Sequence, residues 1–129
     1  MSEPVVCPCG SGERYGACCG PAHAGTPAPT AEALMRSRYS AFALGLGSYL
    51  LASWHPSTRP ADLDLDDAVT WRRLQIVDTV AGGADDAEGE VEFRAAFRTP
   101  TGAGLLHERS RFVREDGRWR YLTGDVLGG

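Results

Sequence analysis

The chain has no lysine: its 129 residues include thirteen basic side chains, and all of them are arginines. This absence excludes a lysine Schiff base, a lysine nucleophile and a lysine-anchored pyridoxal cofactor. A compositional bias of the genome accounts for the arginines, because arginine and lysine both serve as solubilising surface charges.

Long apolar runs are also absent. A membrane-spanning helix needs about 20 apolar residues, and the longest candidate, residues 41–52, is interrupted by Gly45, Gly47 and Ser48. The first residues show no basic start followed by an apolar stretch, so no secretory signal is predicted. We therefore expect a cytoplasmic protein that does not enter a membrane.

A basic excess is missing as well. The net charge is −4, and charges of both signs are spread along the chain. Proteins that bind nucleic acid usually show a basic excess or a basic face. Nucleic acid is therefore not an expected partner.

The residues that are present divide the chain into three zones. Residues 1–22 contain all four cysteines, and residues 23–29 form a short linker of Pro, Gly and Ala with few other residues. Residues 30–129 have the length and the alternating apolar pattern of one domain.

The third zone opens with two predicted helices. Thr30 is a favourable N-cap, and apolar side chains then recur at helical spacing as far as Gly45, a typical helix stop. Ser48 is the predicted cap of a second, short helix, which ends before Pro56.

A period of two then indicates strands. In residues 71–80, Leu74, Ile76 and Val80 share one parity, and residues 90–98 alternate cleanly between apolar and charged side chains. Such alternation is typical of an antiparallel strand with one face in water.

Two further strands are predicted at about 104–114 and at 119–125, joined by the hairpin signal Asp116-Gly117. Two helices followed by four strands in hairpin succession predict an α+β fold, with helices packed on one face of a curved, four-stranded antiparallel sheet. Four residues of the last strand are expected on one face: Trp119, Tyr121, Thr123 and Asp125.

The cysteines are the strongest signal in the chain. Cys7, Cys9, Cys18 and Cys19 lie within thirteen residues, in the spacing C-x-C-x8-C-C. Four thiolates that converge from two short turns match tetrahedral zinc. Neighbouring glycines allow positive φ and leave backbone N–H groups free to approach sulfur. Because zinc with four thiolates carries a net charge of −2, such donors, together with Arg14, would offset that charge.

Other interpretations of the cysteines stay open at this point. Two disulfides are one alternative, although the adjacency of Cys18 and Cys19 and the missing export signal argue against them. An iron centre is another, but Cys7 and Cys9 are closer than the usual two-residue gap. His23 is a candidate to replace a cysteine ligand or to orient the ligands from outside.

Residues 7–20 resemble the SEC-C motif, a zinc-binding hook first noted at the C-terminus of the SecA preprotein translocase. The resemblance implies that Cys19 takes the position of the last ligand, which is often histidine in that motif. In SecA this motif is associated with binding of the SecB chaperone and of lipid, and lysines contribute to that binding. Here Glu13 and Arg14 stand in place of such a basic pair.

Four more stretches, residues 21–23, 30–41, 54–60 and 106–110, resemble the uncharacterised bacterial YchJ family. This resemblance covers nearly the whole chain. It implies an N-terminal SEC-C knuckle followed by a cystatin-like cone similar to nuclear transport factor 2, which agrees with the order of helices and strands predicted above.

A cone-shaped α+β domain often leaves a pocket between helices and sheet. Glu108 shares the parity of Phe112, so it is predicted to point inward, where an ion pair with Arg38 would satisfy it. His55 is predicted to cap the end of the second helix. No Ser-His-Asp or Cys-His arrangement is legible, so no catalytic residue is assigned. The residues predicted for the pocket are Arg38, Tyr39, Trp54, His55, Arg59, Glu108, Ser110, Trp119 and Tyr121.

Two functions follow from these patterns. The favoured one is a binding module whose zinc knuckle docks onto a protein partner, because a site with four protein ligands has no open position for catalysis. The alternative is a small-ligand-binding protein or enzyme that uses the pocket of the α+β domain.

Overall fold

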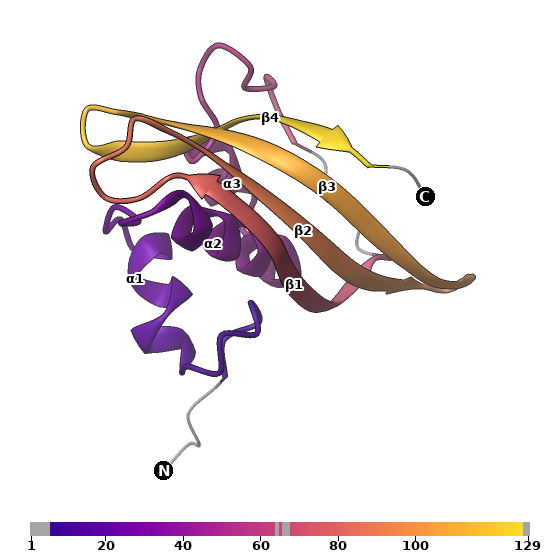
Figure 1. Cartoon of the computed structure of the whole chain (residues 1–129). Helices are drawn as coiled ribbons and strands as arrows, with labels where there is room; N and C mark the ends of the chain where they lie inside the picture. The colour runs from indigo at the N-terminus through magenta and orange to yellow at the C-terminus, as the bar shows by residue number, and fades with distance from the viewer. Residues whose placement is uncertain (1–5, 64, 66–67, 128–129) are drawn as a thin grey trace.

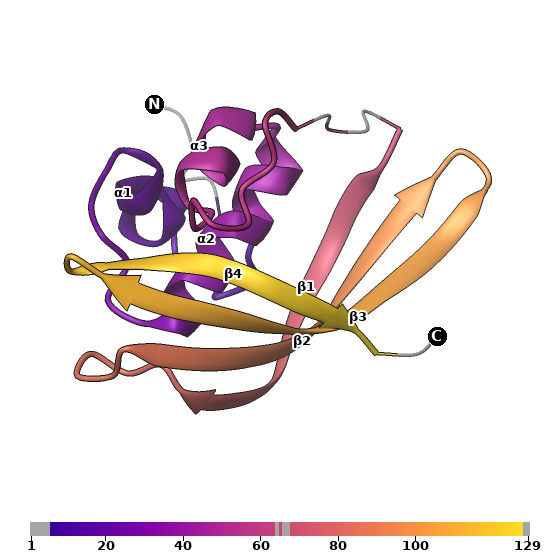
Figure 2. The ribbon, with the colours of Figure 1, turned by 90° about the horizontal axis from the view of Figure 1, so that it is seen from above.

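The computed structural model describes residues 6–63, 65 and 68–127. Its first half is helical and its second half is a four-stranded antiparallel sheet in the order β1-β2-β3-β4. The helices lie together against one face of the curved sheet, and the turn between β2 and β3 projects away from them (Figures 1 and 2). The elements are η1 (Tyr15–Ala17), α1 (Cys19–His23), α2 (Ala31–Leu44), α3 (Gly47–Ala52), β1 (Thr70–Ala81), β2 (Glu88–Thr99), β3 (Gly102–Glu115) and β4 (Arg118–Val126).

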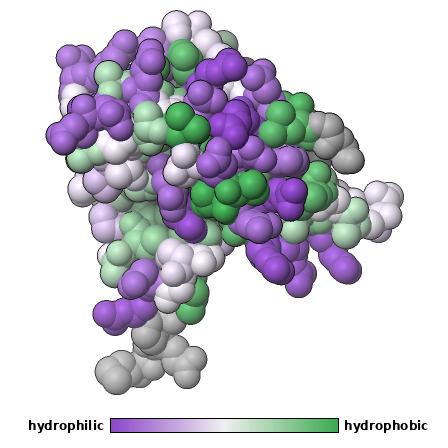
Figure 3. All heavy atoms as spheres, in the orientation of Figure 1, coloured by the Kyte–Doolittle hydropathy of each residue, from purple (hydrophilic) through white to green (hydrophobic). Residues whose placement is uncertain are grey.

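This arrangement confirms the predicted α+β class and the curved antiparallel sheet. Among the described residues, no helix combines the length and the apolar character that crossing a bilayer requires. Hydrophilic and hydrophobic residues are interspersed on the face of the molecule seen in Figure 3.

Helix α2 begins and ends where the sequence indicates. The amide N–H of Ala33 donates to the Thr30 hydroxyl oxygen at 3.0 Å, which satisfies one of the free donors of the first turn. Gly45 follows the helix with φ of 75°, the left-handed conformation that glycine adopts at low cost. Both predictions for this helix are confirmed.

Helix α3 differs in one detail. It begins at Gly47 with Leu46 at the cap position, and no side chain caps it. The prediction that Ser48 caps this helix is therefore wrong, because Ser48 already lies inside the first turn. The helix ends at Ala52, ahead of Pro56.

Strand β1 contains irregularities that its sequence does not reveal. Its register against β2 shifts between Ile76 and Asp78, so the residues beyond the shift change face. Leu74 is buried, but Val80 is 47% exposed. The prediction that Val80 shares a face with Leu74 and Ile76 is wrong for this reason.

Strand β4 changes face in the same way. Its register against β3 shifts at Phe112, where Tyr121 is the partner, while Thr123 lies opposite Arg111. Thr123 and Asp125 are therefore turned away from the face of Tyr121, which corrects their predicted placement. Asp125 instead forms an ion pair with Arg111 at 3.3 Å.

The β3–β4 hairpin turns at Asp116 and Gly117, as predicted. Both residues have positive φ, 54° and 76°. Two successive positive φ values are the mark of the type I′ turn that Asp-Gly favours.

One hydrophobic core joins the cysteine segment to the sheet. It contains side chains of α2, of β1–β3 and of β4, and also three of the cysteines. The N-terminal segment therefore packs on the domain and is not a separate body. The buried residues of this core include Cys7, Cys9, Cys19, Leu34, Met35, Tyr39, Val91, Phe93, Phe112 and Trp119.

Candidate functional site

The first pair of cysteines lies on a tight loop. The amide of Cys7 donates to the carbonyl oxygen of Glu13 at 2.9 Å, and the amide of Gly10 donates to the carbonyl oxygen of Cys7 at 3.2 Å. Gly10 and Gly12 have φ of 80° and 85°, a conformation that costs a residue with a Cβ atom free energy. The loop therefore depends on these glycines to bring Cys7 and Cys9 together.

The second pair lies at the start of α1. Cys18 precedes this short helix with φ of −128° and ψ of −97°. With Cys18 in this conformation, the Sγ atoms of Cys18 and Cys19 lie 4.0 Å apart. Cys9 Sγ is 3.6 Å from Cys18 Sγ, which links the two pairs.

These positions fit one metal ion with four sulfur ligands. All four sulfur atoms lie within 4.8 Å of one another. A tetrahedral zinc ion with Zn–S bonds of about 2.3 Å places its ligands about 3.8 Å apart, close to the separations observed. All four cysteines are free, and their convergence on one point favours a shared metal ion over two disulfides.

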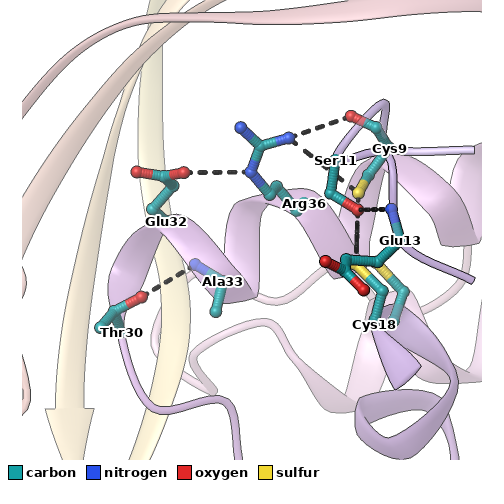
Figure 4. A network of polar contacts seen from close by, with 9 residues as sticks. Cys9, Ser11, Glu13, Cys18, Thr30, Glu32, Ala33 and Arg36 are labelled. Atoms are coloured by element: carbon teal, nitrogen blue, oxygen red, sulfur yellow. Dashed lines mark hydrogen bonds and ion pairs between the residues drawn. The ribbon is translucent and has the colours of Figure 1, made fainter. Parts of the chain in front are cut away.

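The domain contributes polar groups to the sulfur atoms. The hydroxyl group of Ser40, on α2, donates to Cys19 Sγ at 3.3 Å and lies 3.5 Å from Cys7 Sγ. Nη1 of Arg36, one helical turn earlier, donates to the carbonyl oxygen of Cys9 at 3.1 Å and lies 4.0 Å from its sulfur. Figure 4 shows Arg36 reaching from α2 to the Cys9 loop and Ser11 beside Cys18. The Ser11 Oγ and Cys18 Sγ atoms are 3.1 Å apart. Positive charge and O–H donors stabilise negative sulfur.

The burial of the cysteines is uneven. Cys7, Cys9 and Cys19 are 2%, 0% and 3% exposed, whereas Cys18 is half-buried. The hydrogen bond with Cys19 lowers the pKa of Cys9 to about 4, and the same contact, followed by burial, raises the pKa of Cys19. Burial also raises the pKa of Cys18. A proton is therefore lost most easily within the Cys9–Cys19 pair, and a bound metal ion would replace the protons of the remaining thiols.

His23 uses both ring nitrogens away from the sulfur atoms. Its Nε2 donates to the carbonyl oxygen of Ser37 at 2.8 Å. Its Nδ1 therefore accepts from the hydroxyl group of Tyr15, at 2.6 Å. His23 thus ties α1 to α2 and places neither nitrogen among the four sulfur atoms.

The structure brings five of the predicted pocket residues to one cavity of about 130 Å³ between α2 and the sheet. Glu108 points to the face of Phe93 and Val91, as its parity indicates. The cavity also has apolar walls from both layers. The five predicted residues are Arg38, Trp54, Glu108, Ser110 and Tyr121.

Arg38 is 3% exposed and lies between two aromatic rings. Its Cζ atom is 5.0 Å from the ring centroid of Trp54 and 4.4 Å from that of Tyr121. Nη1 donates to the carbonyl oxygen of Leu50 at 3.0 Å and to the Ser53 hydroxyl group at 2.5 Å. Burial lowers the pKa of Arg38 to about 10, so the guanidinium group is still charged at neutral pH.

Glu108 does not pair with Arg38, which corrects that prediction. No ion pair joins these two described residues, and Glu108 Oε2 instead accepts a hydrogen bond from Ser110 at 2.6 Å. The reason is that Ser110, two residues along the same strand, is closer to the carboxylate than the guanidinium group, which the carbonyl of Leu50 and the hydroxyl of Ser53 hold in place.

The remaining predicted residues lie outside this cavity. Tyr39 is buried in the core with its ring facing Trp71, and burial raises its pKa to about 12. Trp119 lines a separate groove of about 450 Å³ between α1, α3 and the β3–β4 hairpin. The guanidinium group of Arg59 donates to the carbonyl oxygen of Trp54 at 2.8 and 3.1 Å.

His55 is not a helix cap, contrary to the prediction. Helix α3 ends at Ala52, and the His55 ring lies between Ser57, at 2.7 Å, and Glu115, at 2.8 Å. Because Glu115 is at the end of β3, this contact fixes the loop after α3 to the sheet.

Sequence reasoning missed the groups that contact sulfur from outside the cysteine segment. Arg36 and Ser40 are four residues apart and therefore share one face of α2. The sequence shows this spacing, but it does not predict that this face of α2 contacts the cysteines. Within the cysteine segment, Ser11 also contacts sulfur, and it carried no signal beyond its position between two glycines.

Fold and site together define a class of protein: an NTF2-like α+β domain with a four-cysteine SEC-C segment packed against its helix α2. A sequence model of the SEC-C motif matches residues 6–21. A model described as the middle NTF2-like domain of YchJ matches residues 30–124. The chain belongs to the YchJ family, whose members also carry the name UPF0225.

Relatives resemble the chain over nearly its whole length. A UPF0225 protein of Streptomyces coelicolor is 57% identical over 122 residues, covering 94% of this chain and 95% of the relative. The solution structure of a SEC-C motif protein from Rhodopseudomonas palustris matches with a TM-score of 0.83 at 36% identity, over 95% and 98% of the two chains. The crystal structure of a SEC-C motif protein from Psychrobacter arcticus matches with a TM-score of 0.76 at 30% identity, over 95% and 83%.

Proposed function

We propose that Cys7, Cys9, Cys18 and Cys19 bind one zinc ion and that this ion holds the N-terminal segment in the shape that contacts a protein partner. The observation that carries the proposal is the convergence of four sulfur atoms within 4.8 Å of one another. Soft thiolate ligands in a tetrahedral arrangement favour zinc over harder divalent ions.

Zinc in such a site has a structural role. Four protein ligands fill a tetrahedral coordination sphere and leave no position for water or substrate. When bound, the ion supplies a cross-link between the loop of Cys7 and Cys9 and the start of α1. Ser40 and Arg36 orient that cross-link against α2 and offset its negative charge.

Metal analysis tests the identity of the ion. Protein purified from its own host under reducing conditions is expected to contain one zinc ion per chain and little iron. The iron alternative predicts the reverse, together with a visible absorption band. A chain that carries neither metal and gains none from added zinc would contradict the proposal.

The surface of the knuckle supports a role in binding. We call residues 6–23 the knuckle. Its loop at residues 10–14 is exposed along its whole length, and it carries opposite charges at Glu13 and Arg14. A loop held by metal presents these groups in one conformation, which lowers the entropy cost of binding a partner.

Affinity capture from the native host tests this role with three variants. Cys7→Ser/Cys9→Ser removes the metal site, and Glu13→Ala/Arg14→Ala alters the exposed loop without touching a ligand. Arg94→Ala, on an exposed position of β2, is the matched surface control. A partner held by the wild type and the control, but lost from both knuckle variants, is the expected result. Identical partner lists for all four proteins would contradict the proposal.

We also propose that the protein works in the cytoplasm. The support is that its four cysteines are free and close together, a state that a reducing compartment preserves. Fractionation of the native host is expected to place the protein with cytoplasmic markers, and recovery with periplasmic or secreted markers would contradict this.

A further inference from the structure

The cavity between α2 and the sheet contains two oppositely charged side chains that no ion pair joins. Arg38 and Glu108 both line it, yet Glu108 accepts from Ser110 and Arg38 donates to Leu50 and Ser53. Among the described residues, Nη1 is the only guanidinium nitrogen of Arg38 with a hydrogen-bond partner, and Glu108 Oε1 has none. Arg38 is buried and Glu108 is half-buried, so both groups have hydrogen-bonding capacity left for an occupant of the cavity.

A third polar group of the cavity also lacks a partner. The indole N–H of Trp54 is buried and makes no hydrogen bond to any described residue. Tyr121 contributes a hydroxyl group that remains protonated, because burial and then Glu108 raise its pKa to about 12. The cavity therefore offers donors near Arg38 and an acceptor at Glu108.

The sheet provides space for the carboxylate of Glu108. Gly124 on β4 lies opposite Ser110, and a Cβ atom at this position would overlap Glu108 Oε2 and lie 2.7 Å from the Tyr121 hydroxyl oxygen. Any side chain at position 124 would displace the carboxylate. The absence of a side chain there is part of how the cavity is built.

The rest of the cavity is apolar and small. Met35, Phe42, Phe93 and Leu106 complete its walls. Its volume of about 130 Å³ is well below the roughly 300–1,000 Å³ of pockets that hold drug-sized ligands. An occupant must therefore be small, with a short apolar part beside its polar groups.

We propose that this cavity binds a small zwitterion of the α-amino-acid type, with its carboxylate at Arg38, its ammonium group at Glu108 and a short apolar side chain against Phe42, Phe93 and Leu106. A simple anion would meet the charge of Glu108, and a simple cation would meet that of Arg38. In an α-amino acid the carboxylate and the ammonium group lie on neighbouring atoms, so one molecule can meet both side chains. A charge-assisted hydrogen bond then forms at each of the two groups.

Binding can be followed through the indole N–H signals of the protein in ¹⁵N–¹H NMR spectra. The probe is L-valine, and three analogues serve for comparison. Isovalerate lacks the ammonium group and isobutylamine lacks the carboxylate. Isovaleramide carries no charge. L-Valine is expected to shift the Trp54 signal in a saturable way, with a dissociation constant on the order of 1 mM or below. Trp119 is the internal control, because its indole N–H is also buried and unpartnered but lies outside this cavity.

Variants separate charge recognition from general effects. Glu108→Gln keeps the shape of the side chain and removes its charge, and Gly124→Ala displaces the carboxylate by filling its space. Both are expected to weaken L-valine binding at least about tenfold, the loss expected when a hydrogen bond to a charged group is removed. Glu90→Gln is the control, because Glu90 pairs with Arg109 on the other face of the sheet. It should bind within about twofold of the wild type, since it is outside the cavity.

Three results would overturn the proposal. The first is the absence of a saturable Trp54 shift with L-valine. The second is binding of isovaleramide or isovalerate with the same affinity as L-valine, which would show that the site does not require both charges of the ligand. The third is unchanged affinity in Glu108→Gln. Because none of these measurements depends on the metal ion, their failure leaves the zinc proposal untouched.

Discussion

The knuckle and the sheet domain are stabilised in different ways although they share one core. In the knuckle, residues 6–23, the only buried side chains are Cys7, Cys9 and Cys19, and Val6 is 62% exposed. In the sheet domain, large apolar side chains such as Phe93 and Phe112 fill the space between α2 and the strands. A segment with so little apolar surface to bury needs another source of stability, and the proposed metal cross-link would supply it.

Helix α2 is the element that contacts both the knuckle and the cavity of the sheet domain. Ser40 and Arg36 lie on the face of α2 that contacts the cysteines, whereas Arg38 and Met35 line the cavity on the side of the sheet. Helix α2 therefore contacts the cysteine cluster on one side and lines the cavity on the other. Substitutions on the two sides should separate the two regions.

The largest effect is expected from Cys9→Ser. Cys9 is fully buried and lies 3.6 Å from Cys18 Sγ, and structural zinc contributes about 10–16 kcal/mol in isolated zinc-finger peptides. We expect the variant to lose the metal at equimolar zinc and its knuckle amide signals to collapse. The signals of β2 and β3 serve as the internal control and should persist. Retention of one tightly bound metal ion would show that Cys9 is not a ligand.

Phe112→Ala should have the next largest effect, and on the other region. Phe112 is 1% exposed and packs against Tyr121, so its loss should lower the free energy of unfolding by about 3–5 kcal/mol. Urea unfolding measures this, with Val126→Ala, at a position 70% exposed, as a control expected to change it by less than about 0.5 kcal/mol. The folded variant should keep its metal. Metal loss before the sheet unfolds would mean that the two regions depend on each other more closely than we propose.

Ser40→Ala tests the contact between the regions. Removing the hydroxyl group that donates to Cys19 Sγ should weaken metal affinity about 10–100-fold, as for other groups that orient metal ligands. Ser37→Ala is a matched control on the same helix, because its hydroxyl group bonds Leu34 and Tyr49 and not sulfur. Competition with a chelator of known affinity distinguishes them. Equal affinities in the two variants would remove Ser40 from the metal centre.

The smallest effect is expected from Thr30→Ala. The hydroxyl oxygen of Thr30 caps α2, and its loss should cost about 1 kcal/mol of unfolding free energy. Metal affinity should not change, because Thr30 is at the opposite end of the helix from Ser40. Urea unfolding and chelator competition on the same sample give both numbers. A changed metal affinity would show that α2 transmits strain from its cap to the knuckle.

The parts of the fold that local chemistry determines could be predicted from the sequence. Thr30, Gly45 and the Asp116-Gly117 turn act through their own backbone and side chains, so their positions mark the ends of elements. The alternation in β2 identified its buried face for the same reason. The close spacing of the cysteines also predicted that their sulfur atoms meet.

The parts that depend on distant contacts could not be predicted in the same way. The register shifts that turn Val80 and Thr123 outward leave no mark in the alternation itself. The hydrogen-bond partners of Arg38 and His55 could not be predicted either. Arg38 bonds Leu50 and Ser53, and His55 bonds Glu115, and these partners come close only in the folded chain. The sequence shows Ser40 only as a helix residue, because its contact with sulfur arises only when the fold places Cys19 of α1 beside it.

The most direct test of the central claim is amide hydrogen exchange measured with and without a zinc chelator. If the metal ion holds the knuckle while apolar packing holds the sheet domain, removing the ion should greatly speed exchange at the amides of Cys7, Gly10 and Cys18. Amides in the middle of β2 and β3 should keep their protection. Unchanged exchange in the knuckle after the metal has been removed would contradict the account.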